Sequence, residues 1–243
     1  MARFFVSPNE LLNNFIVLTG ENAAHARVLR LQQGEQVVVC DGEGNECNCT
    51  VSDVNTSQIS LVVNKRCESV AEPSIRASIY MAFSKGDKLE HVIQKATELG
   101  AYEIVAFPSS RSISKPDEKS IEKKLDRWQK IAVSAAEQSG RGYVPKVIVL
   151  KNFTEAIKRG AVADKAILFY ENEQATTLHM ALTAGAYKSI SLLTGPEGGL
   201  EGAEVAQAVE TGFSVCSLGR RILRCETAPL CALSAVMYDA GEF

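Results

Sequence analysis

Residues 192–199 read Leu-Leu-Thr-Gly-Pro-Glu-Gly-Gly, and they join an apolar, strand-like run to a glycine-rich turn that carries a single carboxylate. Residues 189–193 have the length and the β-compatible composition of a buried strand. The glycines and the proline then allow the backbone to turn sharply. Because glycine has no Cβ, a flat ligand can lie directly against the peptide groups of Gly198 and Gly199. The stretch therefore predicts a strand that leads into a ligand-binding loop.

A second unusual loop occurs closer to the C-terminus. Residues 217–224 read Ser-Leu-Gly-Arg-Arg-Ile-Leu-Arg and precede Glu-Thr-Ala at 226–228, where a helix-like run begins. A glycine-rich turn on its own is also consistent with a tight strand-to-helix connection that binds nothing. Two such loops that end neighbouring strands favour one shared site, because ligands of open α/β sheets bind beyond the carboxyl ends of the strands.

Two common nucleotide-binding motifs do not explain the first loop. A phosphate-binding P-loop needs Lys-Ser or Lys-Thr after its glycines, whereas Gly199 is followed by Leu200 and Glu201. A Rossmann dinucleotide fingerprint fails as well, because the Gly-x-x-Gly-Gly spacing of residues 195–199 is wrong. The loop therefore belongs to neither class.

The pattern of predicted secondary structure changes near Glu72 and Pro73. Before this point short β-like pieces recur, with turn residues at 41–45. Strands are expected at residues 15–18, 36–40, 46–51 and 59–63. The recurrence predicts a small β-barrel domain over residues 1–72.

Beyond Pro73, strand-like and helix-like segments alternate. Strands are expected at residues 75–83, 102–107, 147–150, 166–170, 190–193 and 213–215. Helical spacing is clearest at residues 89–99, 121–135 and 227–240. This alternation predicts a mostly parallel α/β sheet with helices on both faces over residues 73–243.

Composition limits the class of protein. A chain of 243 residues with 46% hydrophobic content can bury a full core in one large domain or two smaller ones. No apolar run approaches the roughly 18 residues of a membrane span. The seven cysteines are odd in number and form no Cys-x-x-Cys pair, which favours a reduced, cytoplasmic setting. The three histidines are scattered, so no metal site is expected.

The net charge of −3 hides an uneven distribution. Residues 1–72 hold five basic and nine acidic residues, whereas residues 111–146 hold nine basic and five acidic residues. This basic segment is either a phosphate-facing surface or a solvated helix face, because Glu118, Glu122 and Asp126 offer partners one helical turn away. The basic residues considered for phosphate contacts are Arg111, Lys115, Lys119, Lys123, Lys124, Arg127, Lys130 and Arg141.

Five motifs together resemble one known family. They are Gly-Pro-Glu-Gly-Gly at 195–199, Leu-Gly-Arg-Arg-Ile-Leu-Arg at 218–224 with Glu-Thr-Ala at 226–228, Glu-Leu-Gly at 98–100, Gln-Ser-Gly-Arg at 138–141, and His-Ala-Arg-Val-Leu-Arg at 25–30. In this order, over nearly the whole chain, they are similar to RsmE, the 16S rRNA (uracil(1498)-N(3))-methyltransferase family of the SPOUT superfamily. Cys225 departs from the pattern, because the family usually has threonine there.

The resemblance implies a SPOUT-type fold and an activity. The N-terminal domain is expected to be a PUA-like RNA-binding β-barrel, and the C-terminal sheet is expected to carry a deep trefoil knot. The resemblance also implies a cytoplasmic homodimer that methylates N3 of a uridine in the 16S rRNA of the small ribosomal subunit, with S-adenosyl-L-methionine as methyl donor. Two alternatives stay open: a non-enzymatic RNA-binding or ribosome-assembly factor that retains the fold, and an α/β enzyme that uses another nucleotide.

The resemblance also implies the residues of the site. Arg224 is expected to stabilise negative charge on the uracil oxygens as N3 loses its proton. Glu197 or Glu226 is expected either to take that proton or to serve only the local backbone and the helix dipole. The residues expected to contact the cofactor are Phe169, Tyr170, Glu171, Thr194, Gly195, Pro196, Glu197, Gly198, Leu218, Gly219, Arg221, Ile222 and Leu223.

RNA is expected to be held mainly through its phosphates. Duplex RNA hides its base edges, so the target uracil must come from a loop or be turned outward. Arg27 and Arg30 are also consistent with a simple surface turn, because their domain is acidic overall, and His25 is expected to serve local packing or hydrogen bonding. The residues expected to contact RNA are Arg27, Arg30, Arg111, Lys123, Lys124, Gln138 and Arg141. The segment 138–141 is also expected to reach the partner's cofactor across a dimer interface.

Overall fold

The computed structural model describes residues 1–113 and 117–243, so Lys115 of the basic segment lies outside the described residues. The chain forms two compact units. The smaller unit combines Met1–Glu72 with Val133–Val144, and the larger unit combines Pro73–Ala132 with Pro145–Phe243. Each unit has its own sheet and its own apolar core.

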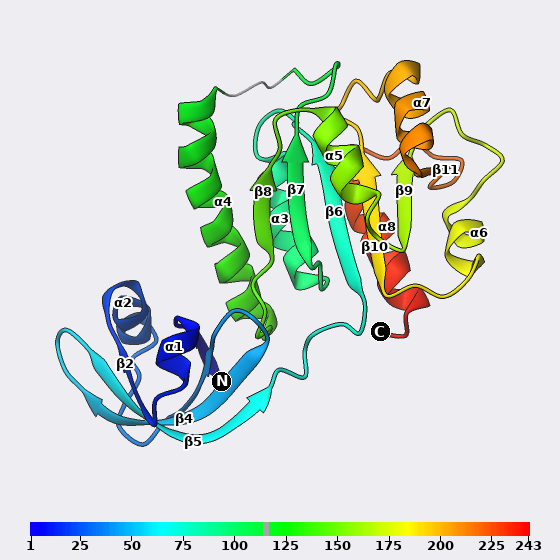
Figure 1. Cartoon of the computed structure of the whole chain (residues 1–243). Helices are drawn as coiled ribbons and strands as arrows, with labels where there is room; N and C mark the ends of the chain where they lie inside the picture. Colours follow the sequence, from blue (N-terminus) through cyan, green and yellow to red (C-terminus); the bar gives the residue numbers. More distant parts are fainter. Residues whose placement is uncertain (114–116) are drawn as a thin grey trace. The chain divides into compact units, whose positions relative to one another are not determined.

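The smaller unit is built on a five-stranded sheet with the order β1-β3-β4-β5-β2. β1 pairs with β3 in parallel, and the other neighbours are antiparallel. Alternate side chains of β4, including Cys47 and Val51, enter the core beside Phe4 and Leu61. The sheet curves along its long strands (Figure 1), which confirms the β-rich fold expected for this part of the chain. The strands are β1 (Ala2–Phe5), β2 (Phe15–Leu18), β3 (Gln36–Cys40), β4 (Asn45–Val54) and β5 (Ile59–Glu68).

Three elements of the smaller unit were not predicted from the sequence pattern: β1, α1 (Pro8–Leu11) and α2 (Gly20–Val28). α2 buries only Ala23 and Ala26. It therefore lacks the apolar stripe by which an amphipathic helix is identified in a sequence.

The larger unit is a six-stranded sheet in which the paired strands of the described chain are all parallel. The strand order is β11-β9-β10-β6-β7-β8. This arrangement confirms the predicted parallel α/β class. The strands are β6 (Arg76–Ala82), β7 (Glu103–Phe107), β8 (Lys146–Val149), β9 (Lys165–Phe169), β10 (Ser189–Thr194) and β11 (Ser214–Cys216).

Helices cover both faces of this sheet. α3 and α8 lie on one face, and α5 and α7 lie on the other (Figure 1). On the second face, Phe153 and Ile157 of α5 pack against Phe107 and Leu193 in a single apolar core. The helices of this unit are α3 (Lys88–Glu98), α5 (Phe153–Gly160), α6 (Leu178–Thr183), α7 (Gly202–Thr211) and α8 (Thr227–Asp239), and α4 (Glu118–Ser139) contributes residues to both units.

The strand order explains why distant loops meet. β10 lies between β9 and β6, and β11 lies on the other side of β9. Because all four strands are parallel, the segments that follow them leave the sheet at the same edge. The glycine-rich loop after β10 and the arginine-containing loop after β11 are thereby brought together, as predicted.

Candidate functional site

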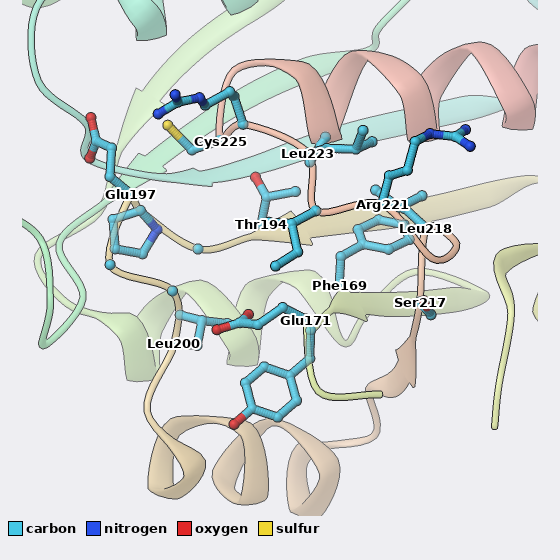
Figure 2. A pocket seen from close by; sticks show the side chains of 18 of the residues that line it. Phe169, Glu171, Thr194, Glu197, Leu200, Ser217, Leu218, Arg221, Leu223 and Cys225 are labelled. Carbon is cyan, nitrogen blue, oxygen red and sulfur yellow. The ribbon is translucent and has the colours of Figure 1, made fainter. Parts of the chain in front are cut away.

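A cavity of about 480 Å³ lies at this edge of the larger unit. It is lined by the segments that follow β9, β10 and β11, together with Lys88 at the start of α3. Figure 2 shows Glu171 and Leu200 on one side of the cavity and Leu223 on the other, with Thr194 between them. Every residue that the sequence predicted as a cofactor contact lines this cavity.

The glycines of the loop after β10 are required by its geometry. Gly199 has a positive φ of 70°, and a Cβ there would lie 2.4 Å from Oε1 of Glu171. A Cβ on Gly195 would lie 2.9 Å from Cγ of Leu200. The close approach of backbone and side chains therefore excludes larger residues at both positions, and the loop can present its peptide groups to a ligand.

The loop after β11 turns at Gly219, which has a positive φ of 102°. Oγ of Ser217 fixes the turn by accepting a 3.1 Å hydrogen bond from the Gly219 amide. Within the part of the chain that the structure describes, the amides of Arg221, Ile222 and Leu223 have no hydrogen-bond partner. These donors are therefore available to a ligand in the cavity.

Lys88 joins the two glutamates that the sequence suggested as proton acceptors. Its Nζ lies 3.0 Å from Oε1 of Glu197 and 3.5 Å from Oε2 of Glu226. Glu197 also accepts a 2.9 Å hydrogen bond from the amide of Lys85, and the thiol of Cys225 donates to Oε2 of Glu226 at 3.2 Å. These contacts tie the loop after β10 to the beginnings of α3 and α8.

Sequence reasoning did not identify Lys88, which lies 109 residues before Glu197 in the chain. A signal was nevertheless present. Residues 85–88 read Lys-Gly-Asp-Lys directly after a predicted strand, so this segment also leaves the sheet at the edge where ligands bind.

The pKa values of both glutamates are lowered. Burial raises the pKa of Glu197, but hydrogen bonds from the Lys85 amide, from its own amide and from Lys88 outweigh the burial. Burial likewise raises the pKa of Glu226, but its own amide, the Cys225 thiol and Lys88 outweigh that effect. Both carboxylates are therefore ionised and already engaged, which favours a structural role over proton transfer.

Cys225 replaces the threonine expected from the family resemblance without loss of a donor. Burial raises the pKa of its thiol to about 11, so the thiol stays protonated at neutral pH. The contact with Glu226 therefore does not require a hydroxyl group.

Arg224 lines the same cavity and its side chain is exposed. Its carbonyl accepts hydrogen bonds of 2.9 Å from the amides of Thr227 and Ala228, which fixes its backbone at the start of α8. Among the described residues, no carboxylate forms an ion pair with its guanidinium. The placement is compatible with the predicted role of Arg224 toward a substrate, and that role stays a prediction.

The residues expected to contact RNA lie on several elements. Arg27 lies in the last turn of α2 and Arg30 follows the helix, and both are exposed in the smaller unit. Lys123 and Lys124 are exposed on the part of α4 that belongs to the larger unit, and Gln138 is exposed near the end of the same helix. Their exposure allows contacts with phosphate, which stay predictions.

Arg111 lies beside the glycine-rich loop. Its Nη1 donates a 3.1 Å hydrogen bond to the carbonyl of Gly198, and its Nε lies 3.6 Å from Oε1 of Glu201. About half of the side chain is exposed. Arg111 therefore supports the loop after β10, and it also retains an accessible guanidinium.

Arg141 cannot contact phosphate in this structure, so that prediction is wrong. Arg141 is 3% exposed, and its Nη2 and Nε lie 2.7 Å and 3.1 Å from Oε2 of Glu72. The other oxygen of Glu72 accepts hydrogen bonds from the amides of Gly142 and Tyr143. A guanidinium presents a planar fork of donors that suits a carboxylate. Arg141 therefore holds residues 133–144 within the smaller unit.

Neither a metal-binding cluster nor a membrane-spanning helix is found in the described residues. No group of three or more His, Cys, Asp or Glu side chains among them is arranged to hold a metal ion. In residues 1–113 and 117–243, no helix has the length and apolar character needed to cross a membrane.

Comparison with known proteins assigns the chain to a family. The family described as RNA methyltransferase domain matches residues 71–237, and the one described as RNA methyltransferase PUA domain matches residues 18–64. The ribosomal RNA small subunit methyltransferase E of Bacillus subtilis (strain 168) is 40% identical over 228 residues, which is 91% of this chain and 89% of that protein. This chain belongs to the ribosomal RNA small subunit methyltransferase E family.

Solved structures of similar chains agree with this membership. A ribosomal RNA small subunit methyltransferase E from Neisseria gonorrhoeae, bound to S-adenosyl methionine, is 29% identical with a TM-score of 0.87, over 98% of this chain and 97% of that chain. A methyltransferase from Legionella pneumophila, in complex with the bound cofactor SAM, is 28% identical with a TM-score of 0.86 and the same coverage. The methyltransferase E fold therefore extends over both units of this chain.

Proposed function

We propose that this protein transfers a methyl group from S-adenosyl-L-methionine to N3 of a uridine in the 16S rRNA of the small ribosomal subunit, at the position numbered 1498 in the rRNA. The observation that carries the proposal is the cavity at the edge of the parallel sheet, where both glycine-containing loops of a methyltransferase E chain converge. Two solved relatives hold S-adenosylmethionine.

The residues of the cavity fit this cofactor. The unpartnered amides of residues 221–223 offer donors for the ring nitrogens of adenine. Leu218 and Leu223 offer apolar surface for its faces, and the glycines of residues 195–199 leave room for close approach to the backbone. The carboxylate of Glu171 faces the cavity and complements the positive charge of a sulfonium.

The chain's own residues then have limited tasks. The cofactor, when bound, supplies an activated methyl group. The protein therefore has to bind the cofactor, orient the uracil toward it and control the proton on N3. Arg224 stabilises the negative charge that develops on the uracil oxygens. Glu197 and Glu226 are weak candidates for accepting the proton, because a lowered pKa makes each a poorer base than an ordinary carboxylate.

The assignment of domains and partners is part of the proposal. Residues 1–72 form a PUA-like RNA-binding domain, and residues 73–243 form a SPOUT methyltransferase domain with a trefoil knot. The protein acts as a homodimer in the bacterial cytoplasm, where Gln138 reaches toward the partner's cofactor. The exposure of basic side chains in both units supports phosphate contacts by Arg27, Arg30, Arg111, Lys123 and Lys124.

Two measurements test the proposal against its alternatives. Calorimetry should detect binding of S-adenosylmethionine and no comparable binding of ATP, and the reverse result would favour an enzyme that uses another nucleotide. Incubation of small ribosomal subunits with labelled S-adenosylmethionine should then give label in RNA. Cofactor binding without any transfer would favour a ribosome-assembly factor that retains the fold.

A further inference from the structure

The glycine-rich loop after β10 is anchored from outside the cofactor cavity as well as from within it. The Lys85 amide and the Lys88 ammonium, at the start of α3, hold the carboxylate of Glu197. The carbonyl of Gly198 is held instead by Arg111, which does not line the cavity and whose side chain is half exposed. One anchor of this loop therefore lies at the surface, where a second ligand can reach it.

A short turn of residues 109–112, after β7, carries this surface anchor. Ser109 and Ser112 are both buried, and their hydroxyl oxygens lie 3.1 Å apart. The Ser112 hydroxyl also accepts a 3.0 Å hydrogen bond from the Ser109 amide, and the Ser112 amide donates to the Ser109 carbonyl at 3.1 Å. The amide of Ser110 donates a 2.9 Å hydrogen bond to Oε1 of Glu204 in the first turn of α7. These bonds fix the turn against the helix that follows the glycine-rich loop.

The guanidinium of Arg111 uses one of its two edges. Its Nη1 donates to the Gly198 carbonyl at 3.1 Å, and within the part of the chain that the structure describes this is its one hydrogen bond. Its Nε lies 3.6 Å from Oε1 of Glu201, which is too long for a hydrogen bond. A guanidinium has five N–H donors in a planar fork, so the edge formed by Nε and Nη2 can still bind a pair of phosphate oxygens.

We propose that Arg111 is a positioning residue that couples RNA binding to cofactor binding. One edge of its guanidinium holds the Gly198 carbonyl, and the other edge binds a phosphate of the RNA. This inference rests on the proposed function for the identity of the RNA.

The coupling follows from the sharing of one side chain. A half-exposed arginine loses rotamer freedom when it binds either partner, and this cost arises only once when both partners are bound. The RNA and the cofactor should therefore raise each other's affinity. Because linkage is reciprocal, the factor should be the same in both directions.

Equilibrium binding of labelled S-adenosylhomocysteine tests the coupling, because this molecule lacks the methyl group and no transfer occurs. Saturating small ribosomal subunits should raise its affinity for the parent protein at least about fivefold, the lower end of typical coupling. In Arg111→Ala the affinity without subunits should fall about two- to tenfold, as expected for one lost hydrogen bond, and subunits should no longer change it. Equal coupling factors in the parent and Arg111→Ala, or no coupling in the parent, would overturn the proposal.

Subunit binding with and without S-adenosylhomocysteine gives the reciprocal measurement, with Lys123→Ala as the matched control. Lys123 is exposed in the same unit, and within the described residues it makes no hydrogen bond or ion pair to the glycine-rich loop. Its variant should keep the coupling factor of the parent, whereas Arg111→Ala should give a factor near one. Loss of coupling in both variants would show an effect that is not specific to Arg111 and would overturn the proposal.

Arg111→Lys separates the two-edged guanidinium from its charge. The salt dependence of subunit binding should stay parental because the charge is retained, but the coupling should fall because a single ammonium has no second edge. Full coupling in this variant would overturn the two-edged arrangement. Methyl transfer by the parent is measured on the same subunits. Transfer without coupling would overturn this inference alone, whereas an absence of transfer would overturn the proposed function on which it rests.

Discussion

Arg224 is the cation on which the proposed chemistry depends. N3 of uracil is protonated at neutral pH, so a group must stabilise the anion as the proton leaves. Arg224→Ala should lower the rate of methyl transfer by about 10² or more, the scale of losing one preorganised charge-stabilising donor. Arg224→Lys should recover only part of the rate, because lysine lacks the planar fork of the guanidinium.

Single-turnover kinetics with saturating RNA and cofactor measure this effect. Cofactor affinity, measured by calorimetry, should barely change in either variant, since the backbone and not the guanidinium of this loop faces the cofactor in the proposal. A parental rate for Arg224→Ala would show that another group, or the RNA itself, stabilises the anion.

Lys88→Met should change the titration of two carboxylates. Lys88 helps to lower the pKa values of Glu197 and Glu226, while burial acts in the opposite direction, so removal of the cation should raise both values. A carboxylate whose pKa is lowered by folding stabilises the folded loop at pH values above its ordinary pKa of about 4.3. This stabilisation is lost as the pH falls through the lowered pKa of the folded protein. The variant should therefore lose cofactor affinity at a higher pH than the parent.

Calorimetry across a pH series, with Lys95→Met as control, tests this expectation. Lys95 pairs with Glu98 on the same helix and, among the described residues, does not line the cavity, so its removal leaves the cavity unchanged. Identical pH profiles for the parent and Lys88→Met would show that Lys88 does not govern the two glutamates.

Individual side chains differed in how far the sequence could predict them. The glycines at 195, 199 and 219 were predictable, because backbone geometry allows few substitutes there. The roles of Lys88 and Arg141 were not, because each depends on a carboxylate that lies far away in the chain. A basic side chain looks the same in a sequence whether it is exposed or paired.

At the scale of the loop after β11, the backbone conformation of Gly219 should control cofactor binding. Gly219 and Gly185 have nearly equal φ angles of 102° and 101°, and a Cβ would meet nothing within 4 Å at either position. Valine should therefore strain both backbones similarly, by about 1–3 kcal/mol. Only Gly219 lines the cavity, so Gly219→Val should abolish cofactor binding while Gly185→Val retains it.

Calorimetry and thermal melting of the two variants separate strain from binding. Similar losses of stability with a selective loss of affinity would support the loop as the binding element. Parental cofactor affinity in Gly219→Val would remove this loop from the site. Gly198→Val is a second probe, because its Cβ would crowd Cβ of Arg111 at 3.2 Å.

The elements themselves were predictable where apolar residues repeat regularly. β2 and β3 occupy the predicted residues, and α3 and α8 lie within a residue of the predicted bounds. α2 was not predicted, because it buries two alanines and offers no stripe. Short elements that depend on their neighbours leave little periodic signal.

At the scale of the whole molecule, Arg141 should contribute to the stability of the smaller unit. Removal of one partner from a buried ion pair leaves an uncompensated carboxylate, so Arg141→Ala should lower the free energy of unfolding by about 3 kcal/mol or more. Arg27→Ala, at an exposed position, should change it by no more than about 0.5 kcal/mol.

Hydrogen exchange of β3 and β4 reports this unit directly. Faster exchange in Arg141→Ala than in Arg27→Ala is expected. Equal protection in the two variants would mean that the contact between Arg141 and Glu72 does not stabilise the unit.

The sequence predicted only in part which residues belong to each unit. The change of pattern near Glu72 indicated a β-rich segment before an α/β segment. The inclusion of residues 133–144 in the smaller unit was not indicated, because it depends on contacts across about seventy positions of sequence, such as the hydrogen bond from the Gly142 amide to Glu72. Patterns within a short window cannot report such contacts.

The central claim is methylation of one uridine at N3, and mass spectrometry of 16S rRNA tests it most directly. Small ribosomal subunits that lack the modification are incubated with the protein and labelled S-adenosylmethionine, and the rRNA is digested and sequenced by fragment mass. The account predicts one labelled methyl group per subunit, on N3 of the uridine at rRNA position 1498, with the parent and Gly185→Val and none with Gly219→Val. Label on another base or atom, or no label with the parent protein, would contradict it.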